Sequence, residues 1–183
     1  WNRMAKKYDL KNVLQNTGYI IYGEVYGKGI QDMEYGLDDV QVVFFDLYDR
    51  TSGRWLAPER FFAFCLNRGL PTAPELYRGP YDAEAVAAMA EGQSTLPGAN
   101  HVREGIVVKP LTERWSSTIG RVFLKQPGEG YLLRKTPEGE QEARLAEYKA
   151  RTAPIIEAPG ASVHGLPVSL WTRVKRYLGL TKA

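Results

Sequence analysis

Several residue types and patterns are scarce or missing in this sequence, and each scarcity removes a class of protein. Only one cysteine, Cys65, is present among 183 residues, so no internal disulfide can form and a reducing, cytoplasmic compartment is expected. No apolar run is long enough to cross a bilayer, which predicts a protein without a membrane partner. The chain begins at Trp1 rather than Met, and this favours a piece of a longer protein.

Common catalytic signatures are missing as well. The two histidines, His101 and His164, lie in predicted loops without cysteine or acidic residues at metal-ligand spacing. The sequence contains neither a Gly-x-Ser-x-Gly motif nor the Gly-Lys-Ser/Thr of phosphate-binding loops. These absences argue against a zinc site of ordinary spacing, a serine-hydrolase nucleophile elbow and a P-loop nucleotide site.

What is present is typical of one globular domain. The chain is long enough to bury a core, and it contains 44% hydrophobic and 25% charged residues. Eleven tyrosines and four tryptophans supply flat side chains that suit base stacking as well as ordinary cores. The formal net charge of +3 is compatible with a polyanionic partner such as nucleic acid.

The apolar pattern predicts short strands mixed with helices. Strands are expected over residues 19–26, 41–48, 104–109, 119–125 and 130–135, and helices over 1–15, 58–67, 83–90 and 137–151. The spacing shows no regular βαβ units, so the predicted fold class is α+β with antiparallel sheets and flanking helices. Residues 152–166 are typical of a Pro/Gly linker, and residues 167–183 are predicted to form an amphipathic basic helix that packs back on the domain.

Two of the predicted strands carry an unexpected residue at a position where alternation expects an inward-facing apolar one. Glu24 lies in an apolar strand and precedes Gly27-Lys28-Gly29, whose glycines let the backbone approach a ligand closely. Phe45 precedes Asp46 after a run of apolar residues, and Phe44 is expected to point the other way, into the core. Without further context, a glutamate that is exposed to solvent or in a salt bridge and a core phenylalanine are the favoured explanations of these residues.

The third segment reads Glu-Gly-Ile-Val-Val-Lys-Pro and covers residues 104–110. Its charged ends, Glu104 and Lys109, point to opposite faces unless the strand bends or ends between them. Charged residues around an apolar centre also occur in ordinary surface strands. A fourth apolar strand ends at Lys125.

In this order and at this spacing, the segments resemble the later nucleotide-binding motifs of the ATP-dependent RNA ligases, within the covalent nucleotidyltransferase superfamily. The resemblance covers residues 1–136 and implies the C-terminal part of a partial nucleotidyltransferase (ATP-grasp-like ligase) domain. It implies joining of RNA 3′-hydroxyl and 5′-phosphate ends through adenylylated intermediates, in RNA repair. It also implies ATP and Mg²⁺ or Mn²⁺ as cofactors, nicked duplex RNA or RNA ends as partner, and a monomer. Residues 120–135 resemble the Deinococcus-type branch more than the phage T4 type.

The same resemblance assigns roles to five residues. It implies that Glu24 contacts the ribose of the bound adenylate and that Phe45 stacks on the adenine. Glu104 would serve the nucleotide and the divalent metal, and Lys125 would contact the α-phosphate and neutralise charge that develops during transfer. Lys109 would lie near the phosphates or the bound strand.

The motif with which the chemistry of this family starts, Lys-x-Asp-Gly, is missing here. Its lysine attacks the α-phosphate of ATP. The nearest match begins at Lys7, but it lacks the glycine and lies 17 residues before Glu24, whereas the family places several strands and helices between the two. Lys7 is therefore interpreted as a surface helix residue. The N-terminal part of the domain is expected as a missing partner, without which this chain does not adenylylate itself. A second departure is Pro127, where the family commonly has another lysine.

Other interpretations stay open at the level of sequence. A DNA ligase or an mRNA-capping-type nucleotidyltransferase would share the aromatic platform, which alone does not settle the choice of base. A non-catalytic nucleic-acid-binding remnant would keep the groove without the nucleophile. An α+β domain with accidental matches is disfavoured by three matches in the family order.

Overall fold

The computed structural model describes residues 1–30, 33 and 35–152, so the predicted C-terminal helix and all but the first residue of the predicted linker lie outside the described residues. The elements, in chain order, are α1 (Asn2–Lys7), α2 (Leu10–Leu14), β1 (Tyr19–Gly27), β2 (Val40–Asp49), β3 (Arg54–Trp55), α3 (Pro58–Leu66), α4 (Ala83–Ala90), β4 (Gly105–Val108), β5 (Trp115–Ser116), β6 (Gly120–Arg121), β7 (Leu124–Pro127), α5 (Glu129–Leu133), the 3₁₀ helix η1 (Glu138–Glu140) and α6 (Gln141–Thr152). Over these ranges, no helix is both long and apolar enough to span a membrane.

The first layer is a sheet with the order β1-β2-β3, in which β1 and β2 pair antiparallel as predicted. One of its faces carries Val42, Phe44 and Leu47, which are buried in the main core together with residues of α1, α2 and α3. Removal of these apolar side chains from water supplies the free energy that holds the three helices against the sheet. Cys65 of α3 lies in this core and is fully buried.

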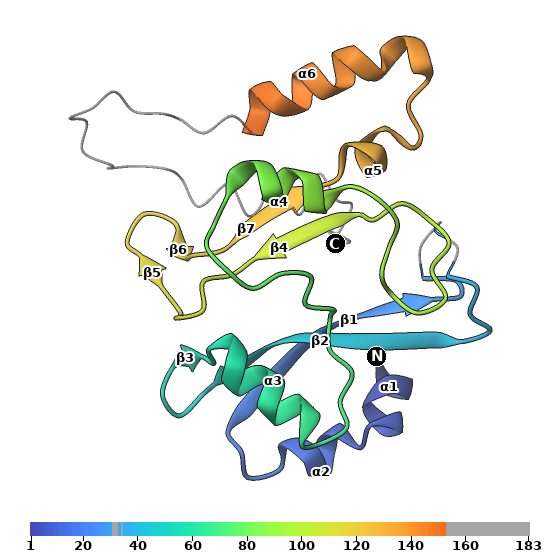
Figure 1. Cartoon of the computed structure of the whole chain (residues 1–183). Coiled ribbons are helices and arrows are strands. Elements are labelled where there is room, and N and C mark those ends of the chain that lie inside the picture. The colour runs from blue at the N-terminus through green and yellow to red at the C-terminus, as the bar shows by residue number, and fades with distance from the viewer. Residues whose placement is uncertain (31–32, 34, 153–183) are drawn as a thin grey trace.

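The second layer is an antiparallel ribbon of β4 and β7, covered by α4 (Figure 1). The α4 helix begins after Asp82, whose carboxylate accepts a hydrogen bond of 2.7 Å from the backbone N–H of Ala85. Figure 1 shows the ribbon between α4 and the face of the first sheet that the helices leave uncovered. The predicted α+β class with antiparallel sheets is therefore confirmed.

The single helix predicted over residues 1–15 is wrong, because two helices form there. Asp9 adopts a left-handed conformation (φ 46°) between α1 and α2. Aspartate tolerates this conformation better than most residues, and the Asn12 side chain donates a hydrogen bond of 2.7 Å to the Asp9 carboxylate. The sequence pattern did not reveal this local break.

Two strand predictions also need correction. The strand expected over residues 119–125 is divided into β6, which pairs with β5, and β7, which pairs with β4. Residues 130–135 were expected to be extended, but α5 occupies Glu129–Leu133. Its first turn is held by Glu91, whose carboxylate accepts hydrogen bonds from the backbone N–H groups of Glu129 and Gly130 at 2.6 and 3.3 Å.

Candidate functional site

A β-bulge at Phe45 decides which side chains of β2 face the second layer. The register between the strands shifts at Tyr22 and Gly23 of β1, so Phe45 is the residue without a partner. A Cβ atom at Gly23 would lie 2.6 Å from the Val43 carbonyl oxygen. Only glycine therefore permits the close approach of the two strands beside the bulge.

The bulge reverses the alternation of β2. Phe44 and Leu47 are both fully buried in the main core although they are three positions apart in sequence, and the first of them confirms the predicted core position. Phe45 and Asp46 lie between them and are both contacted by Lys109 from the second layer. Phe45 is 37% exposed, so a flat ligand can reach it.

Lys109 follows β4 directly and holds the bulge. Its Nζ donates a hydrogen bond of 2.6 Å to the carbonyl oxygen of Phe45 and lies 5.6 Å from the centre of the Phe45 ring. A bulged residue drops out of the ladder of the sheet, and a lysine donor satisfies the carbonyl that is left. Burial lowers the pKa of Lys109, and the attraction of Asp46 offsets part of that shift.

Glu24 is affected electrostatically by Glu104 and Lys125 of the second layer. Glu24 is on β1 opposite Val43, Glu104 directly precedes β4, and Lys125 is on β7. Burial raises the pKa of the Glu24 carboxyl, the charge of Glu104 raises that pKa further, and Lys125 lowers it. Glu24 is nevertheless exposed to solvent, so a polar ligand can reach it.

Two tyrosines, Tyr35 and Tyr131, are affected by the charge of Glu104. The sequence pattern did not single out either of them. Burial raises the pKa of Tyr35 to about 12, and the charges of Glu104 and Glu24 add to the effect. Burial and the charge of Glu104 also raise the pKa of Tyr131, which shares a hydrogen bond with Glu104. Both phenols stay protonated at neutral pH, so the Tyr131 hydroxyl can donate to Glu104. The high tyrosine content of the sequence is the only signal for them, and it does not indicate which of the tyrosines lie near the site.

Arg121 is the centre of an ion cluster that sequence reasoning also missed. Its guanidinium donates to Asp46 at 2.7 and 2.9 Å and to Glu113 at 2.6 and 2.9 Å. The guanidinium carbon lies 4.2 Å from the centre of the Trp55 ring, and Lys109 Nζ is 3.0 Å from the Asp46 carboxylate. Burial alone would lower the pKa of Arg121, but the hydrogen bonds to the two carboxylates outweigh burial and raise it.

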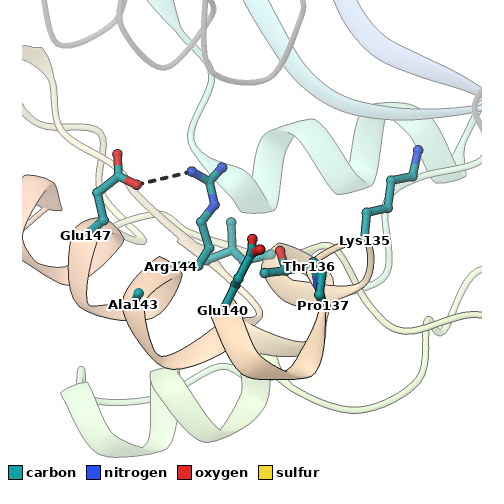
Figure 2. A pocket seen from close by; sticks show the side chains of 8 residues that line it. Lys135, Thr136, Pro137, Glu140, Ala143, Arg144 and Glu147 are labelled. Carbon is teal, nitrogen blue, oxygen red and sulfur yellow. Dashed lines mark hydrogen bonds and ion pairs between the residues drawn. The ribbon is translucent and has the colours of Figure 1, made fainter.

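A hollow of about 600 Å³ lies in a different part of the molecule, between α5, η1 and α6 (Figure 2). Figure 2 shows Arg144 and Glu147 of α6 joined across its edge, at 3.4 Å. None of the five residues that the sequence singles out for the site lines this hollow. The candidate site is therefore the group formed by Glu24, Phe45, Glu104, Lys109 and Lys125, which lies apart from this hollow.

The carboxylates of the candidate site suit a divalent ion that is shared with a ligand. Among the described residues, no group of three or more histidine, cysteine or acidic side chains could hold a metal ion. Glu104 and Glu24 do offer carboxylate oxygens, and Mg²⁺ is commonly bound by one or two carboxylates together with waters and substrate phosphates. The chemistry of these donors fits such an ion better than a metal enclosed by protein alone.

Comparison with known proteins gives a consistent result. A family model described as RNA ligase matches residues 1–144, while no curated protein sequence matches. A solved RNA ligase of Naegleria gruberi with pyrophosphate is 25% identical, with a TM-score of 0.61, and the match covers 73% of this chain and 40% of that chain. A variant of that ligase with ATP and manganese is 26% identical, with a TM-score of 0.61, and the match covers 72% of this chain and 39% of that one.

A further variant of the Naegleria ligase, with AMP and manganese, matches with 25% identity and a TM-score of 0.61, over 72% of this chain and 39% of that one. The present chain thus spans about two fifths of the length of the solved chains that it matches.

Proposed function

Because this chain belongs to the RNA ligase family, we propose that it is the later part of the catalytic domain of an ATP-dependent RNA ligase. The intact enzyme joins RNA 3′-hydroxyl and 5′-phosphate ends through adenylylated intermediates, in RNA repair. The observation that carries this proposal is that Lys109 of the second layer contacts Phe45 of the first, while Glu104 and Lys125 of the same second layer act electrostatically on Glu24. The ATP and AMP in the Naegleria structures support a nucleotide as the ligand of this site.

Each residue of the candidate site has a chemical role in this proposal. Phe45 offers its exposed ring as a platform for the adenine, since stacking is open to any flat base. Glu24 binds the ribose hydroxyls through its carboxylate. Lys125 places an ammonium beside the α-phosphate and stabilises the charge that develops on it. Lys109 belongs to the same site through its contacts with Phe45.

Glu104 holds the divalent ion, Mg²⁺ or Mn²⁺, with Tyr131 donating to the same carboxylate. When bound, such an ion neutralises phosphate charge. The manganese in the Naegleria structures supports this assignment. Tyr131 orients the Glu104 carboxylate and leaves its remaining lone pairs for the ion.

The proposal extends to the organisation of the chain. Residues 1–136 form the nucleotidyltransferase part, residues 137–151 a charged helix, and the segments beyond that a linker and a basic helix. The family branch is the Deinococcus type, and the protein is a cytoplasmic monomer. The nucleophile lysine belongs to an N-terminal part that this chain does not include. Lys7 is an exposed residue at the end of α1 that donates a hydrogen bond of 2.8 Å to Gln41, which supports this view.

One step of the reaction needs no nucleophile lysine and is therefore the sharpest test. The 3′-hydroxyl attacks the 5′-phosphorus of RNA that already carries AMP. The new phosphodiester bond forms, the bond to the AMP phosphate breaks, AMP leaves, and the hydroxyl proton passes to solvent. We expect this chain, given Mn²⁺ or Mg²⁺ and a nicked duplex with a pre-adenylylated 5′ end, to produce sealed RNA on a denaturing gel.

The controls separate the competing interpretations. Lys125→Ala should abolish sealing, whereas Lys11→Ala, which removes an exposed lysine of α2, should leave it unchanged. ATP labelled at the α-phosphate should not label the protein. Binding of AMP without sealing would favour the non-catalytic remnant, and a chain that binds neither AMP nor nicked RNA would refute the proposal.

A further inference from the structure

The ion cluster of Asp46, Lys109, Glu113 and Arg121 connects the two layers immediately beside the Phe45 bulge. Asp46 belongs to β2, Arg121 ends β6, and the other two residues lie in the segment between β4 and β5. Their side chains are well enclosed, with 10% exposure for Asp46, 11% for Arg121, 19% for Glu113 and 22% for Lys109. Ion pairs with this little exposure are screened much less by salt than surface pairs.

Four of the five N–H donors of Arg121 are occupied by side chains of the protein itself. Nε, Nη1 and Nη2 together make four hydrogen bonds to Asp46 and Glu113, and the flat face of the guanidinium lies against Trp55. A guanidinium whose N–H groups are already bonded to carboxylates on both sides cannot also bind a phosphate through two parallel hydrogen bonds. Arg121 therefore differs from Lys125, which is exposed on β7.

The cluster holds the bulge at two adjacent points. Lys109 binds the carbonyl oxygen of Phe45, and Arg121 and Lys109 together bind the carboxylate of the next residue, Asp46. A bulged residue lacks the ladder bonds that fix an ordinary strand residue, so these side chains replace them. Glu113 holds the other side of Arg121 and thereby fixes the direction of its fork.

From this geometry we infer that Arg121 and Glu113 are positioning residues that act through Asp46 and Lys109 to hold the Phe45 ring in the orientation needed to stack on the base. The inference rests on the proposed nucleotide-binding function and deepens it. It predicts an effect on recognition of the base and none on recognition of phosphate. A purely structural role of the cluster would affect both.

The test compares two ligands that differ in having a base. Binding of AMP and of inorganic pyrophosphate, each with Mn²⁺, is measured by calorimetry on the full chain. Arg121→Gln should weaken AMP binding about tenfold, as loss of a stacked base does, and should change pyrophosphate binding by less than about twofold. Glu113→Gln is a milder change and should also weaken AMP binding. This variant replaces Arg121→Gln in the test if Arg121→Gln fails to fold.

A matched control and a double-mutant cycle complete the design. Arg78→Gln breaks another arginine–carboxylate pair, with Glu75 at 2.7 Å, on the surface, and should leave both affinities unchanged. If Arg121 acts through Phe45, adding Arg121→Gln to Phe45→Ala should cause no further loss of AMP affinity. Such non-additivity is the expected result.

The outcomes distinguish the two proposals. A wild-type chain that binds neither ligand refutes the nucleotide site and the inference with it. If Phe45→Ala weakens AMP binding but Arg121→Gln and Glu113→Gln do not, the site stands and the inference is overturned. An equal loss of AMP and pyrophosphate affinity in folded variants also overturns the inference. The cluster would then stabilise the whole site and would not specifically orient Phe45.

Discussion

At the scale of single residues, one extra residue in β2 accounts for the character of the candidate site. Without the bulge at Phe45, the alternation that turns Phe44 into the main core would also turn Asp46, two positions later, into that core. With the bulge, Leu47 takes the core position, and the acidic and aromatic neighbours both turn towards the second layer. The same insertion therefore completes the core and exposes the platform.

Cys65 permits a prediction at the same scale, because it is the only cysteine and is fully buried. Burial raises the pKa of its thiol from 9.0 to about 11. The thiolate is the reactive form, so alkylation by iodoacetamide at pH 8 should be at least about a hundredfold slower in the folded chain than in urea. Mass spectrometry of the quenched protein measures the rate without background from other cysteines.

The same pKa shift has a consequence for stability. Folding favours the protonated thiol of Cys65, so its contribution is complete below pH 9 and disappears as the pH rises towards 11. Cys65→Ala should therefore lose less stability than the wild type between these pH values, as measured by urea unfolding. Equal losses in both chains would show that the thiol is not responsible.

At the scale of elements, the pairing of β4 with β7 depends on Gly105, which separates Glu104 from the apolar centre of the strand. Its φ is 144°, and a Cβ atom there would lie 2.3 Å from the carbonyl oxygen of Gln126 on the partner strand. Both the backbone conformation and the space exclude a side chain. The glycine that follows Glu104 is thus required for the strand pair that sets Glu104 beside the site.

Gly105→Ala should accordingly destabilise the chain by more than about 2 kcal/mol, because either the side chain clashes or the two strands separate. Gly139→Ala is the matched control, since nothing lies within 4 Å of a Cβ atom at this position of η1, and its effect should stay within about 0.5 kcal/mol. Urea unfolding followed by circular dichroism measures both. A Gly105→Ala chain as stable as the control would show that the ribbon tolerates a shift.

At the scale of the whole molecule, the balance of charge sets how RNA binding depends on salt. The formal net charge is only +3, and two of the basic residues near the site, Lys109 and Arg121, are paired with carboxylates. These two cations are therefore less available to displace counterions from phosphates at the site. Binding of RNA should rely on local contacts more than on a broad basic surface.

This argument predicts a shallow salt dependence for RNA binding. Contact with about three phosphates of a single strand corresponds to a slope near −2 in a plot of log K against log salt concentration. Fluorescence anisotropy of labelled RNA between about 50 and 200 mM salt gives this slope. A slope steeper than about −5 would contradict the prediction and would indicate a concentrated basic surface.

The sequence by itself determined the features that depend on near neighbours. The apolar pattern predicted the strands that form β1 and β2, the buried position of Phe44, and helices over residues 58–67 and 83–90, where α3 and α4 lie. The α+β class followed from the order of these elements. Such signals are legible because they repeat every two to four residues along the chain.

Only the tertiary structure decided the features that join distant segments. Arg121 meets Asp46 across 75 positions, Lys109 meets the Phe45 carbonyl across 64, and the start of α5 meets Glu91 across 38. Within its own segment, each of these charged side chains fits an ordinary pattern. Its role becomes visible only when packing brings its distant partner within hydrogen-bond distance. Buried polar groups must find partners wherever the fold places them, so periodicity along the sequence could not reveal the cluster, the bulge or the short helix that completes the site.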